Sequence, residues 1–471
     1  MRKKTHFFGD ARLLVPFRSL IWSMSTQLSV ILRRLSKNHA QEKSFGSFIN
    51  HPSVTPSRLI QQYWQDRNVS WSGKHLLLYQ DSSVLSFKKT KQRTDLGYVG
   101  KGEVHGGFEL HNSLLVDAQS RACYGIGGAQ VHSNEFNSVE HNKQRKRSLR
   151  HVSFSQKETY RWYSTIDQST TNCAGASRYT VIADQEADIY ELFSLYKERQ
   201  WDWLIRATDY RRVRHSNGST MLLSQFLQEI PVSFSYQTQV STSQNRTSHQ
   251  ALLRVKFSPI TMIKSSKNPT KSLPDTLCMY VIDIREDDTS VLADETPIHW
   301  VLVSSHAVTT DQEAAQLIEW YCERWNIEQL YRTEKTQGLN IEQAQLETTH
   351  GLANLSVVSI MAAAQVMALV MAREPKQPID AQIILNQQEI ECSLWLNPTL
   401  EGKTDKQKNQ HPPNSLAFVA WVVARLGGWS PHVNKPAGPI TMIHGLVRFK
   451  AIVEGFALKN TTPNQQVMGL P

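Results

Sequence analysis

Cysteine is scarce in this chain, and no two cysteines have the spacing of a zinc site. The 471 residues contain five, at widely separated positions: Cys123, Cys173, Cys278, Cys322 and Cys392. This distribution argues against a structural zinc and fits a reducing cytosol. A secretory signal is not expected either, because Arg18 interrupts the apolar N-terminal stretch and no small-residue cleavage site follows.

Acidic residues are fewer than basic ones, and the imbalance is local. The chain has 52 Lys and Arg against 42 Asp and Glu, a formal charge of +10 and a pI of about 9.2. Residues 1–73 hold eleven Lys and Arg but three Asp and Glu, a net charge of +8, which leaves +2 for the rest. A basic N-terminal module on a nearly neutral body predicts a polyanionic partner. Nucleic acid is the first choice, and an anionic membrane surface is the lesser one.

Long apolar runs are also rare. The strongest lies between Leu355 and Ala372, and it contains Gln365 and several Ala and Ser residues. This composition predicts a buried core helix rather than a membrane span. With 40% hydrophobic residues overall, the chain can bury a sizeable core.

The order of predicted elements indicates a mixed α/β fold. Strand-like runs within residues 76–131 precede a helix at 156–166, and 179–207 reads as strand, helix, strand. Residues 208–299 alternate short strand-like pieces with polar loops, which indicates a β-rich insertion. A strand at 299–305 then resumes the core, and one long helix is expected between the capping box at Thr310 and a stop at Gly338.

These patterns divide the chain into five predicted segments. The first is a helical N-terminal DNA-binding module, the second and fourth form one catalytic core, the third is the insertion, and the last is a helical dimerisation region. Their bounds are 1–73, 74–207, 208–299, 300–373 and 374–471.

Four residues of the expected long helix have side chains that suit phosphate chemistry. Tyr321, Arg324, Glu328 and Lys335 are spaced so that an unbroken helix would carry them on one stripe. Asp81 and Asp184 each follow an apolar strand, and side chains at the ends of neighbouring strands can converge with an acid delivered by a packed helix.

Three clustered carboxylates repel one another unless cations neutralise them, and oxygen-only ligands favour Mg²⁺ or Mn²⁺. Two such ions support phosphoryl transfer. Arg324 and Lys335 could hold the phosphates.

Each of these residues also has a simpler interpretation. An Asp at the end of a strand is usually a turn or cap residue, and Arg324 with Glu328 is an ordinary ion pair four residues apart. Trp300 is more often a core residue than a ligand contact, and Arg206 is open to either interpretation.

Taken together, the residues resemble a known family. Tyr321-x2-Arg324-x3-Glu328-x6-Lys335 matches the signature of the IS-four family of bacterial insertion-sequence transposases, and the chain is similar to the Tn-five-like members. Residues 78–83 and 183–188 look like the segments bearing the family's first and second catalytic Asp, so the matching acids are Asp81 and Asp184. Residues 203–207, 299–302 and 157–162 look like further family segments.

This resemblance implies an RNase H-like core with an inserted β-domain and cut-and-paste transposition by a homodimer on double-stranded DNA, both transposon inverted-repeat ends and target. Asp81, Asp184 and Glu328 would hold Mg²⁺, with Mn²⁺ as an alternative, and the protein would work at the bacterial nucleoid in the cytoplasm. Tyr321, Arg324, Arg332 and Lys335 would position the DNA backbone. Arg206 and Trp300 would contact the transposon end, Trp300 near a flipped base.

Two features depart from the family pattern: Gln185 stands where the family commonly has Arg, and residues 13–44 do not align. The rival hypothesis is therefore a non-catalytic DNA-binding transposition inhibitor, or an inactivated transposase copy. A carboxylate-pair glycoside hydrolase is a further alternative, but a basic N-terminus does not suit a neutral sugar.

Overall fold

The computed structural model describes residues 6–67, 69–88, 93–99, 105–133, 152–215, 217–242, 246–266, 268, 270–432 and 435–461. Its strands are β1 His75–Phe87, β2 Tyr98–Val99, β3 His105–Asp117, β4 Cys123–His132, β5 Arg178–Ala183, β6 Asp202–Arg206, β7 Arg212–Arg214, β8 Thr220–Leu222, β9 Phe234–Val240, β10 His249–Ile263, β11 Thr276–Glu286 and β12 His299–Ser304. Its helices are α1 Leu14–Gln27, α2 Leu32–Leu35, α3 His39–Ile49, α4 Pro56–Arg67, α6 Arg161–Asn172, α7 Tyr190–Glu198, α8 Leu223–Glu229, α9 Asp311–Cys322, α10 Trp325–Lys335, α11 Thr349–Met371, α12 Gln387–Leu400, α13 Leu416–Leu426 and α14 Pro439–Thr461.

The fold is mixed α/β, built on one large mixed sheet. The main path of strands runs β2-β3-β1-β5-β6-β12-β11-β10-β7-β8, with β4 paired to β3 and β9 to β10. Strand β1 is antiparallel to β3 and parallel to β5, which is in turn parallel to β6. The first half of β1, from Leu76 to Tyr79, is fully buried. A continuous buried apolar run is what a central strand covered on both faces requires.

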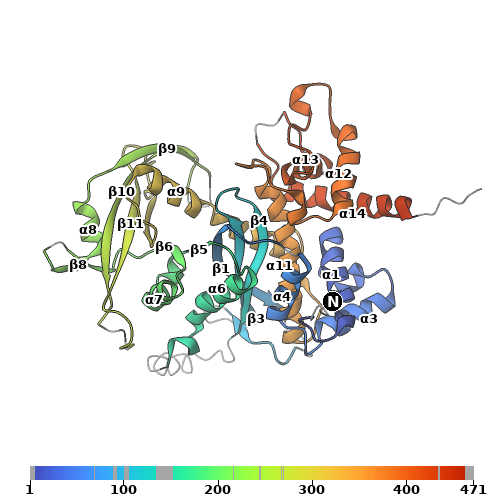
Figure 1. The fold of residues 1–471 in the computed structure, drawn as a ribbon, viewed down its shortest axis with the longest axis horizontal. Helices are drawn as coiled ribbons and strands as arrows, with labels where there is room; N and C mark the ends of the chain where they lie inside the picture. The colour runs from blue at the N-terminus through green and yellow to red at the C-terminus, as the bar shows by residue number, and fades with distance from the viewer. Residues whose placement is uncertain are drawn as a thin grey trace, which may run out of the picture.

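Helices cover the β1–β4 part of the sheet (Figure 1). Helix α6 packs on β3 and β4, while α4 and α11 pack on β4, and α10 lies against β1 and α11. Helix α11 is long and apolar enough to cross a membrane by composition, yet 89% of its most apolar stretch is buried inside the protein. It is therefore the central core helix that the sequence predicts.

Residues 208–299 contain strands β7 to β11 and the short helix α8, and their strands continue the core sheet. The connection is the antiparallel pairing of β11 with β12, from Tyr280↔Ser304 to Arg285↔His299. Whether this region is a separate folding unit stays a prediction.

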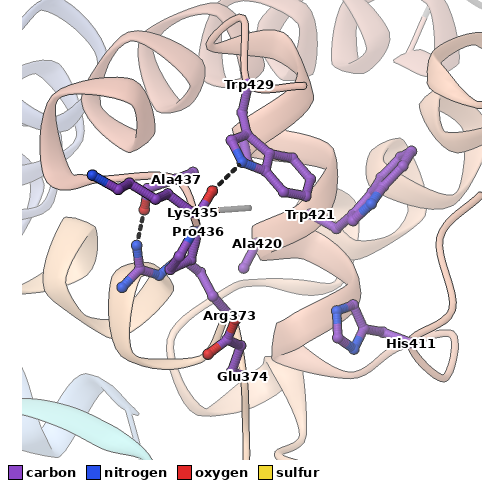
Figure 2. A pocket seen from close by; sticks show the side chains of 10 residues that line it. Arg373, Glu374, His411, Ala420, Trp421, Trp429, Lys435, Pro436 and Ala437 are labelled. Carbon is purple, nitrogen blue, oxygen red and sulfur yellow. Dashed lines mark hydrogen bonds between the residues drawn. The ribbon is translucent and has the colours of Figure 1, made fainter. Parts of the chain in front are cut away.

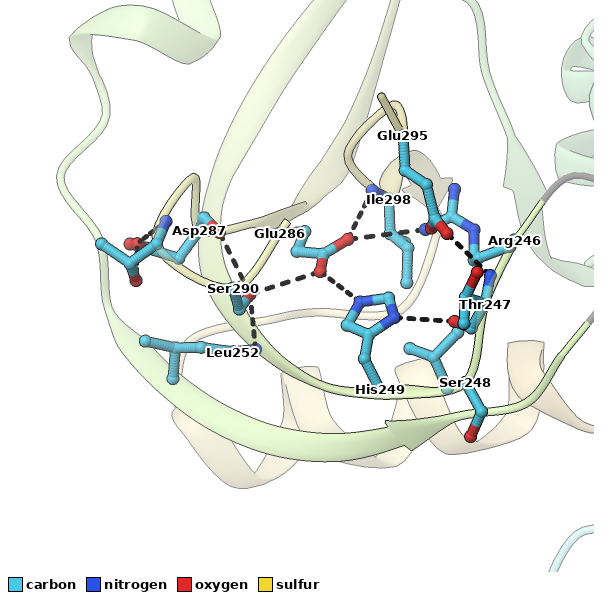
Figure 3. Close-up of polar contacts among 12 residues, drawn as sticks. Arg246, Thr247, Ser248, His249, Leu252, Glu286, Asp287, Ser290, Glu295 and Ile298 are labelled. Atoms are coloured by element: carbon cyan, nitrogen blue, oxygen red, sulfur yellow. Dashed lines mark hydrogen bonds and ion pairs between the residues drawn. The ribbon is translucent and has the colours of Figure 1, made fainter. Parts of the chain in front are cut away.

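A buried carboxylate, Glu286, holds the far end of this region together, as Figure 3 shows. It accepts hydrogen bonds from His249 Nε2 (2.8 Å), Ser290 Oγ (3.2 Å) and the Ile298 backbone N–H (3.0 Å), and it pairs with Arg246. The pKa of Glu286 is lowered because these hydrogen bonds outweigh the effect of burial. Every contact of this carboxylate serves the structure, so we assign it no chemistry.

The expected long helix between Thr310 and Gly338 is two helices. Thr310 and Glu313 form the predicted capping box, but α9 ends at Cys322 and α10 begins at Trp325. Between them the backbone makes tighter i to i+3 hydrogen bonds, from the Arg324 N–H to the Tyr321 carbonyl (3.0 Å) and from Asn326 N–H to Glu323 (2.9 Å). Each residue of such a turn advances by about 120° rather than 100°, so the two halves of the predicted stripe are offset.

Candidate active site

Two of the predicted acids lie in a row across neighbouring strands. Tyr79 of β1 pairs with Ile182 of β5, and Ala183 of β5 pairs with Ile205 of β6. Asp81 lies two residues beyond the last pair of β1 with β5, and Asp184 and Arg206 each lie one residue beyond the last pair of β5 with β6. The parallel pairing of β1, β5 and β6 thus brings two acids and one arginine to the edge of the sheet where β5 and β6 end.

Asp81 differs in one respect from its prediction, because it lies inside a strand and not after one. Strand β1 continues to Phe87, and Asp81 pairs with Asn112 of β3. However, β5 pairs with β1 only as far as Tyr79. The β5 side of β1 is therefore open from Gln80 onward, and this opening admits the side chains that surround Asp81.

Arg324 joins the acid of the strand to the acid of the helix. Its Nη1 lies 3.1 Å from Asp81 Oδ2, and its Nη2 lies 2.5 Å from Glu328 Oε1. The three side chains are 14%, 18% and 28% exposed, so this bridge is mostly shielded from water. Arg324 and Glu328 form the expected ion pair four residues apart, and Arg324 also pairs with Asp81, which is distant in the sequence.

Asp81 lies in an environment that favours its protonated form. Its pKa is raised to about 6, first by burial and further by the charges of Asp184 and Glu328, against the opposing effect of Arg324. Burial therefore outweighs the countercharge of Arg324, and the charges of Asp184 and Glu328 also reach Asp81.

Asp184 is both a cap and a member of this charged group. It is the N-cap of a short 3-10 turn, Gln185–Ala187, where its Oδ1 accepts a hydrogen bond from the Glu186 N–H (3.0 Å). Its charge also acts on Asp81, Arg324 and Tyr321. The neighbouring acid Asp188 instead binds Thr208 and Arg211, which is a structural role.

The aromatic residues lie next to the acids. The rings of Trp300 and Tyr321 make an edge contact with centroids 5.4 Å apart. Burial raises the pKa of Tyr321 to about 12, and the charges of Arg324 and Arg206 act in the opposite direction. Arg206 also donates to the His299 carbonyl (3.3 Å). Arg206, Trp300 and Tyr321 thus border one side of the carboxylates.

The two remaining predicted residues make their contacts outside this group. Lys335 Nζ donates to the Val84 carbonyl (2.7 Å), three residues beyond Asp81, and lies 3.6 Å from Glu342. Arg332 is exposed, with its guanidinium 5.1 Å from the centre of the Trp325 ring. Both lie along α10 beyond Glu328, where a bound DNA backbone could extend.

Two residues that hold the site together, Arg161 and Tyr331, had no role assigned from the sequence, although Arg161 lies in the family-like segment 157–162. Arg161 lies 3.4 Å from Ser82, Glu109 and Glu186, so it connects the segments that carry Asp81 and Asp184. Tyr331 donates to the backbone carbonyls of Asp81 (2.7 Å) and Leu110 (3.1 Å). Only the spacing from Glu328 could have pointed to Tyr331, since it lies on the adjacent face of α10.

Among the described residues, no three His, Cys, Asp or Glu side chains are spaced to bind a metal ion directly. A cavity of about 350 Å³ lies elsewhere, in the C-terminal region (Figure 2). It is lined by Trp421, Trp429, Arg373 and His411, among others, and it shares no residue with the acidic group.

One family model matches this chain. Residues 161–364 match the family described as "Transposase DDE domain", a span that includes Asp184, Arg324 and Glu328 and begins after Asp81. The match supports a DDE-type transposase, a class of nucleases and polynucleotidyl transferases.

Among solved structures, the chain is similar to a cryo-EM structure of the piggyBac transposase synaptic complex with hairpin DNA. The identity is 9% and the TM-score 0.35, over 85% of this chain and 79% of that one. We base no conclusion on a likeness this low.

Proposed function

We propose that this chain is a cut-and-paste transposase of the IS-four, Tn-five-like type, with an RNase H-like catalytic core. The observation that carries the proposal is that Arg324 bridges Asp81 and Glu328, from two distant segments, with the charge of Asp184 acting on the same group. The family match over residues 161–364 and the mixed sheet support it.

The donor types suit Mg²⁺, with Mn²⁺ as the alternative, but the three carboxylates are not spaced to bind an ion while Arg324 bridges Asp81 and Glu328. Asp81, Asp184 and Glu328 supply only oxygen atoms, and the pKa of Asp81 is raised first by burial and to a smaller extent by the charges of the other two acids. When bound, a divalent ion would activate an attacking oxygen and stabilise the leaving oxygen. Arg324 pairs with both Asp81 and Glu328, and a bound cation would free its guanidinium for a DNA phosphate.

The other predicted residues then bind and orient DNA. Tyr321, Arg324, Arg332 and Lys335 follow one another along α9 and α10, and they position the backbone. Arg206 and Trp300 contact the transposon end from the β6 and β12 side, where the indole offers a flat surface to an unpaired base. The steps are nicking, attack of the freed 3′-OH on the opposite strand to give a hairpin, opening of the hairpin, and attack of the 3′-OH on target DNA.

These steps are all in-line displacements at phosphorus, so one set of carboxylates can serve them all. A homodimer paired on two inverted-repeat ends would bring both cuts together, through the C-terminal region of residues 374–471. We place this activity on the bacterial nucleoid in the cytoplasm.

Removing one charge from the acidic group tests the proposal. Glu328→Gln keeps the size of the side chain but weakens cation binding, so DNA nicking should fall at least 100-fold while DNA binding persists. The measurement is cleavage and gel shift, with Mg²⁺, of a labelled duplex taken from the genomic DNA that directly flanks the reading frame. The matched control is Glu198→Gln, an exposed acid at the end of α7, which should cut normally.

The same assay separates the rival. A wild-type protein that binds this duplex but never nicks it, in Mg²⁺ or Mn²⁺, would indicate the non-catalytic inhibitor or an inactivated copy. A Glu328→Gln variant that cuts at the wild-type rate would contradict the assignment of the acids.

A further inference from the structure

A second buried polar cluster lies behind the acidic group. Its centre is Glu323, whose Oε1 accepts a hydrogen bond from Arg121 Nε (2.7 Å) and pairs with Arg121 Nη2. The Tyr79 hydroxyl donates to the other carboxylate oxygen, Oε2 (3.3 Å). Tyr79 is fully buried and the Arg121 side chain is 7% exposed, so water hardly competes for these contacts.

The three members come from three separate parts of the core. Tyr79 is in β1, two residues before Asp81 and on the same face of the strand. Glu323 lies in the break between α9 and α10, directly before Arg324. Arg121 is in the turn between β3 and β4.

Arg121 is held in place by an uncommon backbone. Its φ of 65° is in the left-handed region, which costs free energy for a residue other than glycine. The Asp117 carboxylate accepts hydrogen bonds from the N–H groups of Gln119 (3.0 Å) and Ser120 (2.7 Å), which fixes this turn. The turn therefore presents a buried guanidinium at one fixed position.

We propose that Arg121, Glu323 and Tyr79 are positioning residues that set the α9–α10 break relative to β1, and so bring Arg324 and Glu328 to Asp81. This inference rests on the proposed function, since it concerns the same carboxylates. No contact with DNA is assigned to any of the three. Their role is to fix the angle at which α10 leaves the break. Glu323, the residue before Arg324, is hydrogen-bonded to Tyr79, which lies in the strand that carries Asp81.

The physical consequence is a defect in rate rather than in binding. Without Arg121, the Glu323 carboxylate, whose side chain is 24% exposed, loses its countercharge and moves further toward water, and the break that precedes Arg324 loses its anchor. The DNA-contacting surface, which includes Trp300 and the N-terminal module, stays intact. Small displacements of catalytic groups reduce the cleavage rate strongly, because the reaction requires a narrow range of distances and angles between the reacting atoms.

The experiment measures single-turnover cleavage and dissociation constant separately, on the flanking duplex with Mg²⁺. We expect Arg121→Met and Glu323→Gln each to cut at least tenfold more slowly, with a Kd within twofold of the wild type. The double variant should be no slower than the slower single variant, because both remove the same interaction. Arg121→Lys, which keeps the charge, should recover most of the rate.

Three results would overturn the inference: a wild-type rate in Arg121→Met, additive losses in the double variant, or parallel losses of rate and affinity. If Arg121→Met does not fold, Tyr79→Phe removes only one hydroxyl, and it should cut severalfold more slowly at unchanged Kd. A normal rate in Tyr79→Phe would then overturn the inference. A wild-type protein that does not cut at all contradicts the proposed function instead, so the two failures are distinct.

Discussion

Among single residues, Glu334 is unusual because its carboxyl group is buried in the protein interior. It is fully buried between α10 and α11, where Ser359 Oγ donates to its Oε1 (2.6 Å). Burial raises its pKa from 4.5 to about 8, which exceeds the opposing effects of Ser359 and Lys335. The folded protein therefore keeps this proton at neutral pH, while the unfolded chain releases it above about pH 4.5.

A pH-dependent stability follows from this difference. Between the unfolded and folded pKa values the folded state binds more protons, so the contribution of Glu334 to stability is present at low pH and is lost as pH rises toward 8. Each pKa unit corresponds to roughly 1.4 kcal/mol. Glu334→Gln cannot ionise, so its melting temperature should match the wild type near pH 4.5 and exceed it near pH 8.5.

Thermal unfolding at several pH values checks this prediction, with Glu198→Gln as the exposed control. If the difference in melting temperature between the wild type and Glu334→Gln stays constant across this pH range, Glu334 does not titrate as expected.

The two acids Asp184 and Asp188 make a matched pair with different roles. Asp184→Asn should abolish cleavage yet unfold within about 0.5 kcal/mol of the wild type, because Asn caps a turn as well as Asp. Asp188 is 2% exposed and pairs with Arg211, so Asp188→Asn should lower the free energy of unfolding by about 3 kcal/mol. Urea unfolding and cleavage, measured side by side, distinguish them. A reversed pattern would mean that Asp188 is the catalytic acid.

Among the secondary-structure elements, the contact of α10 with β1 decides where Glu328 lies. Tyr331, one turn after Glu328, donates to the carbonyls of Asp81 and Leu110 and so fixes α10 on the sheet. Tyr331→Phe leaves two buried carbonyls without this donor, and we expect a loss of about 1–3 kcal/mol in the free energy of unfolding. Cleavage should slow as well.

Urea unfolding measures this loss. The control is Tyr210→Phe, since Tyr210 is 79% exposed and its hydroxyl is open to water. If Tyr331→Phe unfolds like Tyr210→Phe, the hydroxyl does not hold the helix to the strand.

Elements with a clear period or cap could be predicted from the sequence, and long-range contacts could not. The capping box of α9, the apolar helix α11 and strand β5 agree with their predictions. The break between α9 and α10 was missed because residues 310–338 contain no Pro or Gly before Gly338. At the break, Glu323 is tied to Arg121, about 200 residues away, and no local pattern records this contact.

The site shows the same division. The residue types and positions of Asp81, Asp184 and Glu328 led to their selection as candidate acids, and their catalytic role stays a prediction. The bridging position of Arg324 depends on the packing of α10 against β1, a tertiary contact that no local pattern records.

Across the whole molecule, the N-terminal and C-terminal helices share one core. Lys450 of α14 and Glu389 of α12 form an ion pair in which each side chain is 3% exposed, and Lys450 also lies 4.2 Å from the centre of the Trp22 ring of α1. Trp22 donates to Glu454 (3.1 Å). The basic N-terminal helices are thus fixed relative to the C-terminal region and, through α11, to the sheet that carries the acids.

This arrangement gives the uneven charge of the chain a testable consequence. Arg33 and Arg34 of α2 are exposed, within the N-terminal segment that carries most of the net charge. If they contact DNA phosphates, each contact releases counterions and adds about 0.9 to the slope of log affinity against log salt. The variant Arg33→Gln/Arg34→Gln should then bind the flanking duplex more weakly and show a slope smaller by about 2.

Fluorescence anisotropy between about 50 and 200 mM salt measures the slope. Lys197→Gln, an exposed cation on α7, is the control and should leave it unchanged. An unaltered slope in the double variant would show that Arg33 and Arg34 of α2 do not contact the DNA phosphates.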